Sequence, residues 1–323
     1  MKRLKTLVSC CVATALTLVG LTGCSSQESY TPPEKSPVLS TPAVGKEGTL
    51  RVGLDMDNAP FSAQPQGSSK TAGIDVDVAA ALADSLGLKL EMVDVGSDPE
   101  SALESNKVDV VVGVKKSDSD ATFWKSDPYL ETSVALFASS SSASVPTESS
   151  SPEIAAQVSS TSSWAVTNEF GDSALTPTND LKSAFSSLES GEVEYVAADA
   201  VIGTYAAKNA GNEASIIALL QQPSGYCVGV LDSNTDLKQA ISEAVASLVD
   251  NGIISVIETK WLGTALDLSN VPLTATAKSS SSSSSASTGS TNGDSTDEET
   301  ADVSTSTQAS NASAGGNASQ TLN

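Results

Sequence analysis

Residues 108–114 read VDVVVGV, a nearly continuous apolar run, and this stretch decides the fold class. A strand buried on both faces of a parallel sheet has such a sequence, because helices cover the sheet on either side. The preceding LES at residues 103–105 predicts the end of a helix. The same pattern recurs further along the chain, with LES at 188–190 and VEYV at 193–196. The sequence therefore predicts two α/β lobes, each with its own sheet.

The segments around this strand show helical or strand periodicity. Residues 75–86 are predicted to form a helix that ends at Gly87. Its apolar residues at helical spacing are Val76, Ala79, Ala80, Ala83 and Leu86. The remaining predicted elements are strands over residues 50–54 and 88–93 and helices over residues 235–251 and 253–262.

The N-terminal segment, from Met1 to Cys24, predicts an export signal. A basic start (MKRLK) precedes an apolar stretch over residues 7–21, which is short for a membrane span. The sequence LTGC at 21–24 resembles a bacterial lipobox, in which signal peptidase cuts before Cys24 and the cysteine thiol is acylated. The alternative is an ordinary signal peptide that is cut nearby.

The lipobox also divides the four cysteines. Cys10 and Cys11 leave with the signal and Cys24 carries lipid, so Cys227 has no partner for an intrachain disulfide. Cys227 lies in YCVGV, which predicts a small buried hydrophobic residue rather than a reactive thiol.

Two segments outside the lobes are predicted to lack a fold of their own. Residues 24–46 are rich in Ser, Pro, Thr and Glu and are predicted to be a flexible tether. Residues 271–323 are predicted to be a disordered tail. Within this tail, residues 278–323 contain 15 Ser and 7 Thr. A segment of this composition can bury too little apolar surface to offset the entropy of ordering.

Composition excludes several functions. The chain has 323 residues, no histidine and a formal net charge of −22. This charge would repel nucleic acid, and the absence of histidine removes Ser-His-Asp and Cys-His catalysis. Residues 46–273 carry 12 Lys+Arg and 32 Asp+Glu, so a charge of −20 lies on the folded part.

Five segments in a fixed order resemble one protein family. They are LRVG at 50–53 with PF at 60–61, GIDVD at 73–77, VDVVV at 108–112 leading to SDPY at 126–129, YCVGV at 226–230, and Gly252 followed by KWLG at 260–263. Over residues 48–263 the chain resembles the extracellular solute-binding proteins of the polar-amino-acid class (solute-binding family 3).

This resemblance implies a two-lobed α/β fold of the type II periplasmic-binding-protein kind, with a hinged cleft between the lobes. Lobe 1 would comprise residues 47–140 and 226–270, and lobe 2 residues 141–225. The chain would cross near Ala138–Ser140 and again near Tyr226–Val230. The resemblance implies a monomer that captures a small polar solute, is anchored outside the cytoplasm by lipid, and delivers the solute to the permease subunits of an ABC importer.

The resemblance also implies which residues of lobe 1 face the ligand. Asp55 follows the first strand, and Asn58 stands where the family often has an aromatic platform. Gly113 and Lys115 end the buried strand. Asp120, or Ser119 if one residue is deleted before SDPY at 126–129, stands where the family usually places an arginine that grips the ligand carboxylate.

Lobe 2 matches the family better. Gln157, Ser160 and Thr161 correspond to a turn whose hydroxyls and helix N-terminus receive the carboxylate. Asp199 corresponds to the aspartate that commonly pairs with the ligand ammonium. The alternative role of Asp199 is an N-cap for residues 200–210, and Ser160 and Thr161 alternatively form a plain loop.

The absent arginine leaves two hypotheses open. Lys115 or Lys116 could hold a ligand carboxylate as a point charge, since an unpaired buried charge is costly. Alternatively the acidic residues of the cleft favour a cation such as a basic amino acid or a polyamine. These residues are Asp55, Asp57, Asp120 and Asp199.

Three functions are compatible with this fold. We expect a receptor of an ABC importer; the alternative is a sensor or adhesion lipoprotein that uses the same fold with a degenerate site. An enzyme is disfavoured because no glutamate stands out as a positioned acid. We therefore expect no catalytic residue, cofactor or metal.

Overall fold

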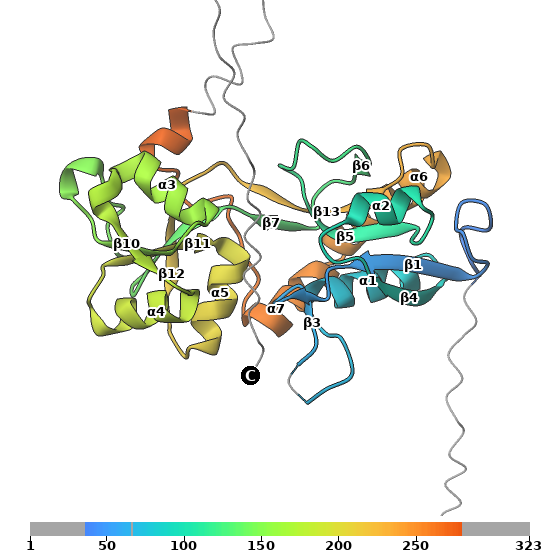
Figure 1. Cartoon of the computed structure of the whole chain (residues 1–323), viewed down its shortest axis with the longest axis horizontal. Coiled ribbons are helices and arrows are strands. Elements are labelled where there is room, and N and C mark those ends of the chain that lie inside the picture. The colour runs from blue at the N-terminus through green and yellow to red at the C-terminus, as the bar shows by residue number, and fades with distance from the viewer. Residues whose placement is uncertain (1–35, 66, 280–323) are drawn as a thin grey trace, which may run out of the picture. The chain divides into compact units, whose positions relative to one another are not determined.

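The computed structural model describes residues 36–65 and 67–279. The predicted signal peptide, Cys24 and the serine run from residue 280 onward lie outside these residues. Within them, two separate β-sheets organise the chain, and a two-stranded hairpin lies beside the first (Figure 1). The predicted α/β class, with one sheet for each copy of the internal echo, is confirmed.

The first sheet has the strand order β4-β1-β5-β13-β6, and β7 also pairs with β13. Its central strands β1 and β5 are parallel, whereas β13 runs antiparallel to β5. The strands are β1 (Thr49–Leu54), β4 (Lys89–Asp94), β5 (Val110–Lys115), β6 (Trp124–Lys125), β7 (Leu130–Thr132) and β13 (Ser224–Val230). The hairpin consists of β2 (Asp57–Asn58) and β3 (Ser62–Ala63).

The second sheet has the order β10-β9-β11-β8-β12. Strands β9, β10 and β11 are parallel, and β8 is antiparallel to β11. The strands are β8 (Val134–Ala138), β9 (Ile154–Gln157), β10 (Leu175–Thr178), β11 (Tyr195–Asp199) and β12 (Ser215–Leu219).

The two sheets are arranged alike. In each, three parallel strands are followed by an antiparallel strand, so β4-β1-β5-β13 corresponds to β10-β9-β11-β8. Strand β5 begins at Val110 and β11 begins at Tyr195, and this separation equals that between the two LES segments at 103 and 188. The sequence echo therefore marks equivalent central strands.

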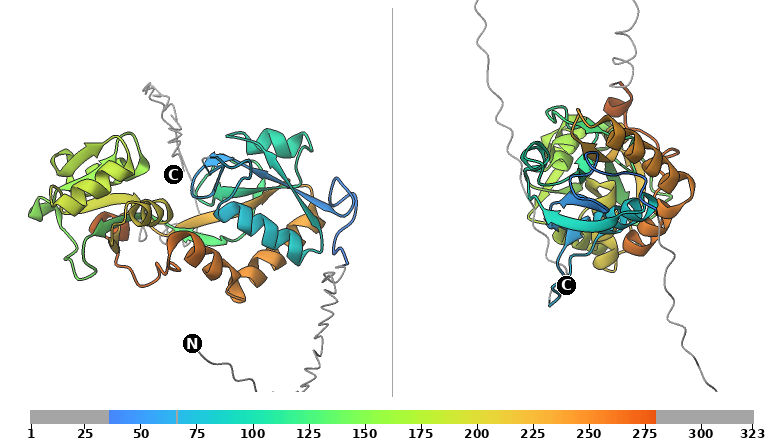
Figure 2. Two further views of the ribbon diagram at one scale, coloured as in Figure 1. Left: turned by 90° about the horizontal axis from the view of Figure 1, so that it is seen from below. Right: turned by 90° about the vertical axis from the view of Figure 1, so that its right-hand side faces the viewer.

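Helices cover both faces of each sheet. Beside the first sheet lie α1 (Ile74–Ser85), α2 (Pro99–Glu104), α6 (Thr235–Asp250) and α7 (Ile253–Leu262). Beside the second lie α3 (Thr161–Phe170), α4 (Leu181–Ser190) and α5 (Ala200–Asn209), together with short 3-10 turns at Glu148–Ser150 and Asp172–Ala174. Helices α1, α6 and α7 pack against one another (Figure 2) and form one core with β1 and β13. Burial of these apolar faces supplies the main stabilisation, at about 25 cal/mol per Å².

Local sequence signals explain where the helices begin and end. The side chain of Asp180 accepts a hydrogen bond from the amide of Ser183 at 2.7 Å and caps α4, which stops at Gly191 with φ +75°. Gly252, with φ +73°, separates α6 from α7 as predicted. Of the five apolar residues predicted to line the buried face of α1, Ala79, Ala83 and Leu86 are buried, whereas Ala80 is exposed. Asp75, Val78 and Leu82 complete the buried face.

The crossings between the sheets differ from those predicted. Only Ser133 separates β7 in the first sheet from β8 in the second, so the first crossing precedes residue 140. The return crossing lies at residues 220–223, before β13 rather than within Tyr226–Val230. Tyr226–Val230 is instead part of the buried strand β13, and Ala138 is the last residue of the buried strand β8, because SGYCVGV and VALFA are apolar enough to fill a core. Ser139 and Ser140 follow β8 and are exposed. The Ser133 hydroxyl donates to the Gln221 carbonyl at 2.8 Å and ties the two crossings together.

The predicted tether is ordered in its second part. Val44 is fully buried in the first core, and the Val38 amide donates to the carbonyl of Leu86 at 2.9 Å. The Gly45 amide donates to the Asp109 carboxylate at 2.8 Å. Residues 36–46 therefore belong to the folded region; residues 24–35 are outside the described part.

The predicted disordered tail begins too early. After α7, the segment formed by residues 263–277, called the strap below, runs to the second sheet (orange in Figure 1). The Leu219 amide donates to the Pro272 carbonyl, and the Thr274 amide donates to the Leu219 carbonyl, both at 2.9 Å. Leu268 is buried in a core of that sheet. The composition of residues 278–323 dominated the prediction, whereas Leu268, Val271 and Leu273 supply apolar anchors before it.

Among the described residues no single helix is both long and apolar enough to cross a membrane. Helices α6 and α7 pass that test only as a pair, and the chain bends by 66° between them.

Candidate ligand site

The carboxyl ends of β1 and β5 lie side by side in the first sheet. The pairing of Gly53 with Val111 brings Asp55 and Gly113 to the same edge two residues further on. Gly113 has φ +88°, and a Cβ atom there would lie 2.3 Å from Oδ2 of Asp75. Glycine is therefore required, because its bare backbone leaves room for the Asp75 carboxylate.

Asp75 is the central ionisable group of this edge. It is 4% exposed and accepts a hydrogen bond from the Tyr129 hydroxyl at 2.6 Å. Burial raises the pKa of Asp75 to about 7; the Tyr129 hydrogen bond lowers it, and the nearby charge of Asp55 raises it further. At neutral pH this carboxyl is therefore poised between its two protonation states.

Tyr226 connects this edge of the first sheet to the corresponding edge of the second sheet, where the parallel strands β9 and β11 end. Its ring packs on Phe61 with 4.4 Å between the ring centroids, and its carbonyl accepts from the Tyr129 amide at 2.9 Å. Its hydroxyl donates to Oδ2 of Asp199, in the second sheet, at 3.3 Å. Burial, followed by the charges of Asp199 and Asp75, raises the pKa of Tyr226 well above its usual value, so the phenol keeps its proton.

Asp199 stands at the end of β11 and at the start of α5. Its Oδ1 accepts from the amides of Val201 at 3.0 Å and Ile202 at 3.1 Å, which confirms the N-cap role. Desolvation raises the pKa of Asp199, although these amides and the positive charge of Lys115 lower it. Its second oxygen receives only the long hydrogen bond from Tyr226.

An unsatisfied hydroxyl lies next to this carboxylate. Thr132 ends β7 and is 7% exposed, and its Oγ1 is the only buried side-chain polar atom without a hydrogen-bond partner in residues 36–65 and 67–279. It lies close enough to Asp199 to lower the pKa of that carboxylate as a hydrogen-bond donor would, although the two groups make no hydrogen bond of normal geometry. Such a buried hydroxyl costs free energy unless a further group satisfies it.

The turn after β9 lies at the same edge of the second sheet. Because Ala156 pairs with Ala197 in parallel strands, the turn that follows Gln157 lies beside Asp199. Ser160 caps α3: its hydroxyl accepts from the Ser163 amide at 3.1 Å and donates to the Gln157 carbonyl at 2.7 Å. Thr161, the first residue of α3, is exposed. The plain-loop alternative for Ser160 is therefore wrong, because the residue caps a helix.

Two further predicted site residues, Asn58 and Asp120, have no described contact with Asp75 or Asp199. Asn58 lies in the β2–β3 hairpin, where its carbonyl accepts from the Phe61 amide at 2.8 Å. Asp120 is exposed in a turn, and its amide donates to the Asp118 carboxylate at 3.1 Å. No described interaction brings Asp120 to Asp75 or Asp199, so the predicted residues do not form one cluster.

Sequence reasoning missed four residues of this region: Asp75, Tyr129, Thr132 and Tyr226. Asp75 has a detectable signal, since it shares the helical phase of buried Val78 and Leu82 in α1. A carboxylate at a core position demands a partner. The partner itself was not predictable, because Tyr129 lies 54 residues away in the sequence.

Cys227 is a buried free cysteine, as predicted, and burial raises its pKa to about 11. This value keeps the thiol protonated and unreactive at neutral pH.

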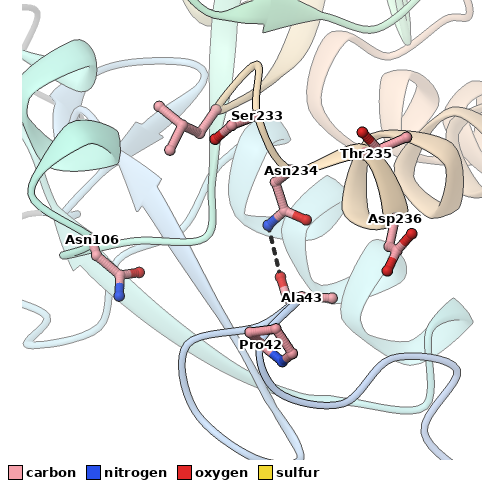
Figure 3. Close-up of a pocket in the computed structure, with 8 residues that line it drawn as sticks. Pro42, Ala43, Asn106, Ser233, Asn234, Thr235 and Asp236 are labelled. Atoms are coloured by element: carbon pink, nitrogen blue, oxygen red, sulfur yellow. Dashed lines mark hydrogen bonds between the residues drawn. The ribbon is translucent and has the colours of Figure 1, made fainter.

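A surface pocket of about 430 Å³ lies elsewhere, at the start of α6 (Figure 3). There the Asn234 side-chain amide donates to the Ala43 carbonyl at 2.9 Å. None of the predicted site residues lines this pocket, and Asp236 is the only charged residue in its lining. The lining residues are Pro42, Ala43, Asn106, Leu231, Ser233, Asn234, Thr235 and Asp236.

Comparison with known proteins agrees with this architecture. Residues 50–264 match the family of bacterial extracellular solute-binding proteins, family 3, and the chain belongs to that family. It is 23% identical over 224 residues to the L-cystine-binding protein TcyA of Bacillus subtilis, covering 68% of this chain and 84% of TcyA. It is 26% identical over 229 residues to the L-cystine-binding protein TcyJ of Escherichia coli K12, covering 68% of this chain and 85% of TcyJ.

A solved structure shows the same fold. The L-cystine solute receptor of Neisseria gonorrhoeae, in its unliganded open conformation, superposes with a TM-score of 0.58 at 23% identity. The match covers 68% of this chain and 94% of the receptor. The predicted type II periplasmic-binding fold is therefore confirmed.

Proposed function

We propose that this protein is the substrate-binding component of an ABC importer and that it captures an amino acid between its two sheets. Family membership supports a solute-binding role. Relatives whose names specify L-cystine support an α-amino acid as the solute class.

Asp199 is the single observation that carries the ligand assignment. Its Oδ1 is committed to the amides that begin α5, whereas its Oδ2 receives only the 3.3 Å hydrogen bond from Tyr226. An ammonium group beside Oδ2 would offer charge-assisted hydrogen bonds to the carboxylate and a donor to the unpartnered Thr132 hydroxyl. A free α-amino group meets both requirements.

We propose that the protein acts outside the cytoplasm and is held at the membrane by lipid on Cys24. The basic start, the apolar stretch and the LTGC sequence support this anchor. Partition into a detergent phase tests it, because Cys24→Ala should move the protein to the aqueous phase.

The ligand itself is tested by a thermal-shift screen followed by calorimetry with L-cystine, L-arginine, L-glutamine, L-glutamate and spermidine. A ligand at 100 times its Kd should stabilise the protein by about 2.7 kcal/mol and raise the melting temperature. We expect at least one amino acid to do so. Binding of spermidine alone would favour a cationic solute without a carboxylate, and binding of none would favour the sensor or adhesion alternative.

A further inference from the structure

An amino acid held by Asp199 also brings a carboxylate, which needs a cationic partner. Apart from Arg3, the sequence contains only Arg51 as an arginine. Arg51 forms a 2.6 Å ion pair with buried Asp109 and donates to the Asn106 carbonyl at 2.7 Å. It is therefore committed to holding the N-terminal segment and the loop before β5, and the carboxylate needs another cation.

The backbone geometry of β5 directs Lys115 toward Tyr226. A bulge at Gly113 shifts the alternation of side chains, so Val111 and Val114 pack in one core while Val112 packs with Tyr226 in the other. Lys115 pairs directly with Tyr226 across the antiparallel ladder. Directly paired residues project from the same face of a sheet, so Lys115 lies beside the tyrosine whose hydroxyl reaches Asp199.

The Lys115 side chain is also unengaged in the described part of the chain. It is exposed, and its ammonium group makes no hydrogen bond or ion pair there. The neighbouring Lys116 is engaged: its Nζ donates to the Ser126 carbonyl at 2.8 Å and lies 3.9 Å from the Asp127 carboxylate. Of the two lysines that could replace an arginine, only Lys115 keeps its charge available.

The charge of Lys115 reaches Asp199. It lowers the pKa of that carboxylate, although the two groups form no ion pair within 4.0 Å. The two groups therefore lie near enough to influence each other while neither neutralises the other in an ion pair.

We propose that Lys115 is the specificity-determining residue that pairs with the ligand α-carboxylate, opposite Asp199, which pairs with the ligand α-ammonium. This assignment rests on the proposed function and adds to it that the solute carries a free carboxylate. Lys115 is a point charge without the bidentate fork of an arginine, so it selects for the charge rather than for the planar shape of the carboxylate.

Matched ligand pairs test the assignment, because each amino acid has an amine that lacks only its carboxylates: agmatine lacks the one carboxylate of L-arginine, and cystamine lacks the two of L-cystine. We would measure the Kd of L-cystine against cystamine and of L-arginine against agmatine by calorimetry. The wild type should prefer the amino acid of the pair it binds. Lys115→Met should weaken binding of the amino acid by at least about tenfold and leave the affinity for the amine unchanged. Lys115→Arg should retain the affinity for the amino acid.

Controls separate the possible outcomes. Lys182→Met removes an exposed lysine from α4, in the second sheet's helical layer, and should change neither affinity. An unchanged preference in Lys115→Met, or equal losses for both members of a pair, would overturn the assignment of Lys115 while leaving the proposed function intact. A wild type that binds no amino acid would overturn both. Because Lys115 is exposed, the Lys115→Met variant should keep its melting temperature; Lys115→Gln provides a second variant.

Discussion

The two edges that form the candidate site have equivalent topology but are built from different kinds of contact. The second-sheet edge consists of helix caps: Ser160 and Asp199 each bond to amides two or three residues further along the chain. The first-sheet edge depends on distant partners, since the Asp75 carboxylate bonds to Tyr129 and rests on Gly113. Equivalent strand order therefore fixes where a site lies, but not which residues give it its chemistry.

The largest expected effect comes from removing the ionisable group of the first-sheet edge. Folded Asp75 has a pKa of about 7 against 3.8 unfolded, so the folded state binds more protons between these values. Its contribution is fully present below pH 3.8 and is lost as the pH rises through about 7, at a cost of up to about 4 kcal/mol. Asp75→Asn should remove this loss and be more stable than the wild type at pH 8, as measured by denaturant unfolding from pH 4.5 to 8.

Glu258 provides the control for that measurement. It is 6% exposed, and burial raises its pKa to about 7, so it titrates in the same window. Glu258→Gln should remove a separate part of the pH dependence, and the double variant should show the sum of both effects. Equal pH slopes for Asp75→Asn and the wild type would show that Asp75 is ionised at neutral pH.

The next largest effect is expected from a change to the carboxylate of the second-sheet edge. Asp199→Asn should still cap α5, because the amide oxygen can accept from Val201 and Ile202. The charge for the ligand ammonium is lost, however, and amino-acid affinity should fall by about 100-fold, or about 2.7 kcal/mol, in calorimetry. Asp180→Asn is a matched control, since Asp180 caps α4 in the same way. Equal affinities for wild type and Asp199→Asn would remove Asp199 from the site.

The smallest effect is expected at a contact of the second sheet, between α3 and the strap. The Glu169 carboxylate in α3 accepts from the Thr274 hydroxyl at 2.9 Å and from the amides of Ala275 at 2.9 Å and Thr276 at 3.0 Å, and so holds the strap. Glu169→Ala should cost about 1 kcal/mol and speed amide exchange of the strap selectively.

The control for the strap is Glu189→Ala, which removes an exposed carboxylate from α4 and should leave exchange unchanged. Unaltered protection of residues 272–276 in Glu169→Ala would mean that apolar contacts such as Leu268 hold the strap without this carboxylate.

Much of the fold was predictable because it depends on local periodicity. The buried run at 108–114, its echo at 188–196 and the stop at Gly252 were all visible in the sequence and correspond to β5, β11 and the α6–α7 junction. The crossings were misplaced because VALFA at 134–138 is compatible with either sheet. Only pairing with β11 and β12 assigns it to the second.

The candidate site, like the fold, was predictable only where it depends on residues that are close in the sequence. Asp199 was predicted as a ligand contact from the resemblance, with a helix cap as the alternative, and the cap is confirmed. From the sequence alone, Lys115 and Lys116 were equal candidates for the cation that holds a ligand carboxylate. They differ only in the folded protein, where Lys116 is engaged by Ser126 and Asp127.

The sequence by itself determined the α/β class, the repeated helix–strand unit and the possible cap at Asp199, because each depends on residues a few positions apart. The tertiary structure alone decided the pKa of Asp75, the link from Tyr226 to Asp199 and the attachment of the strap. The physical reason is that desolvation and hydrogen bonding depend on which distant segments meet, and Asp75 meets Tyr129 only once β5, β7 and α1 have packed.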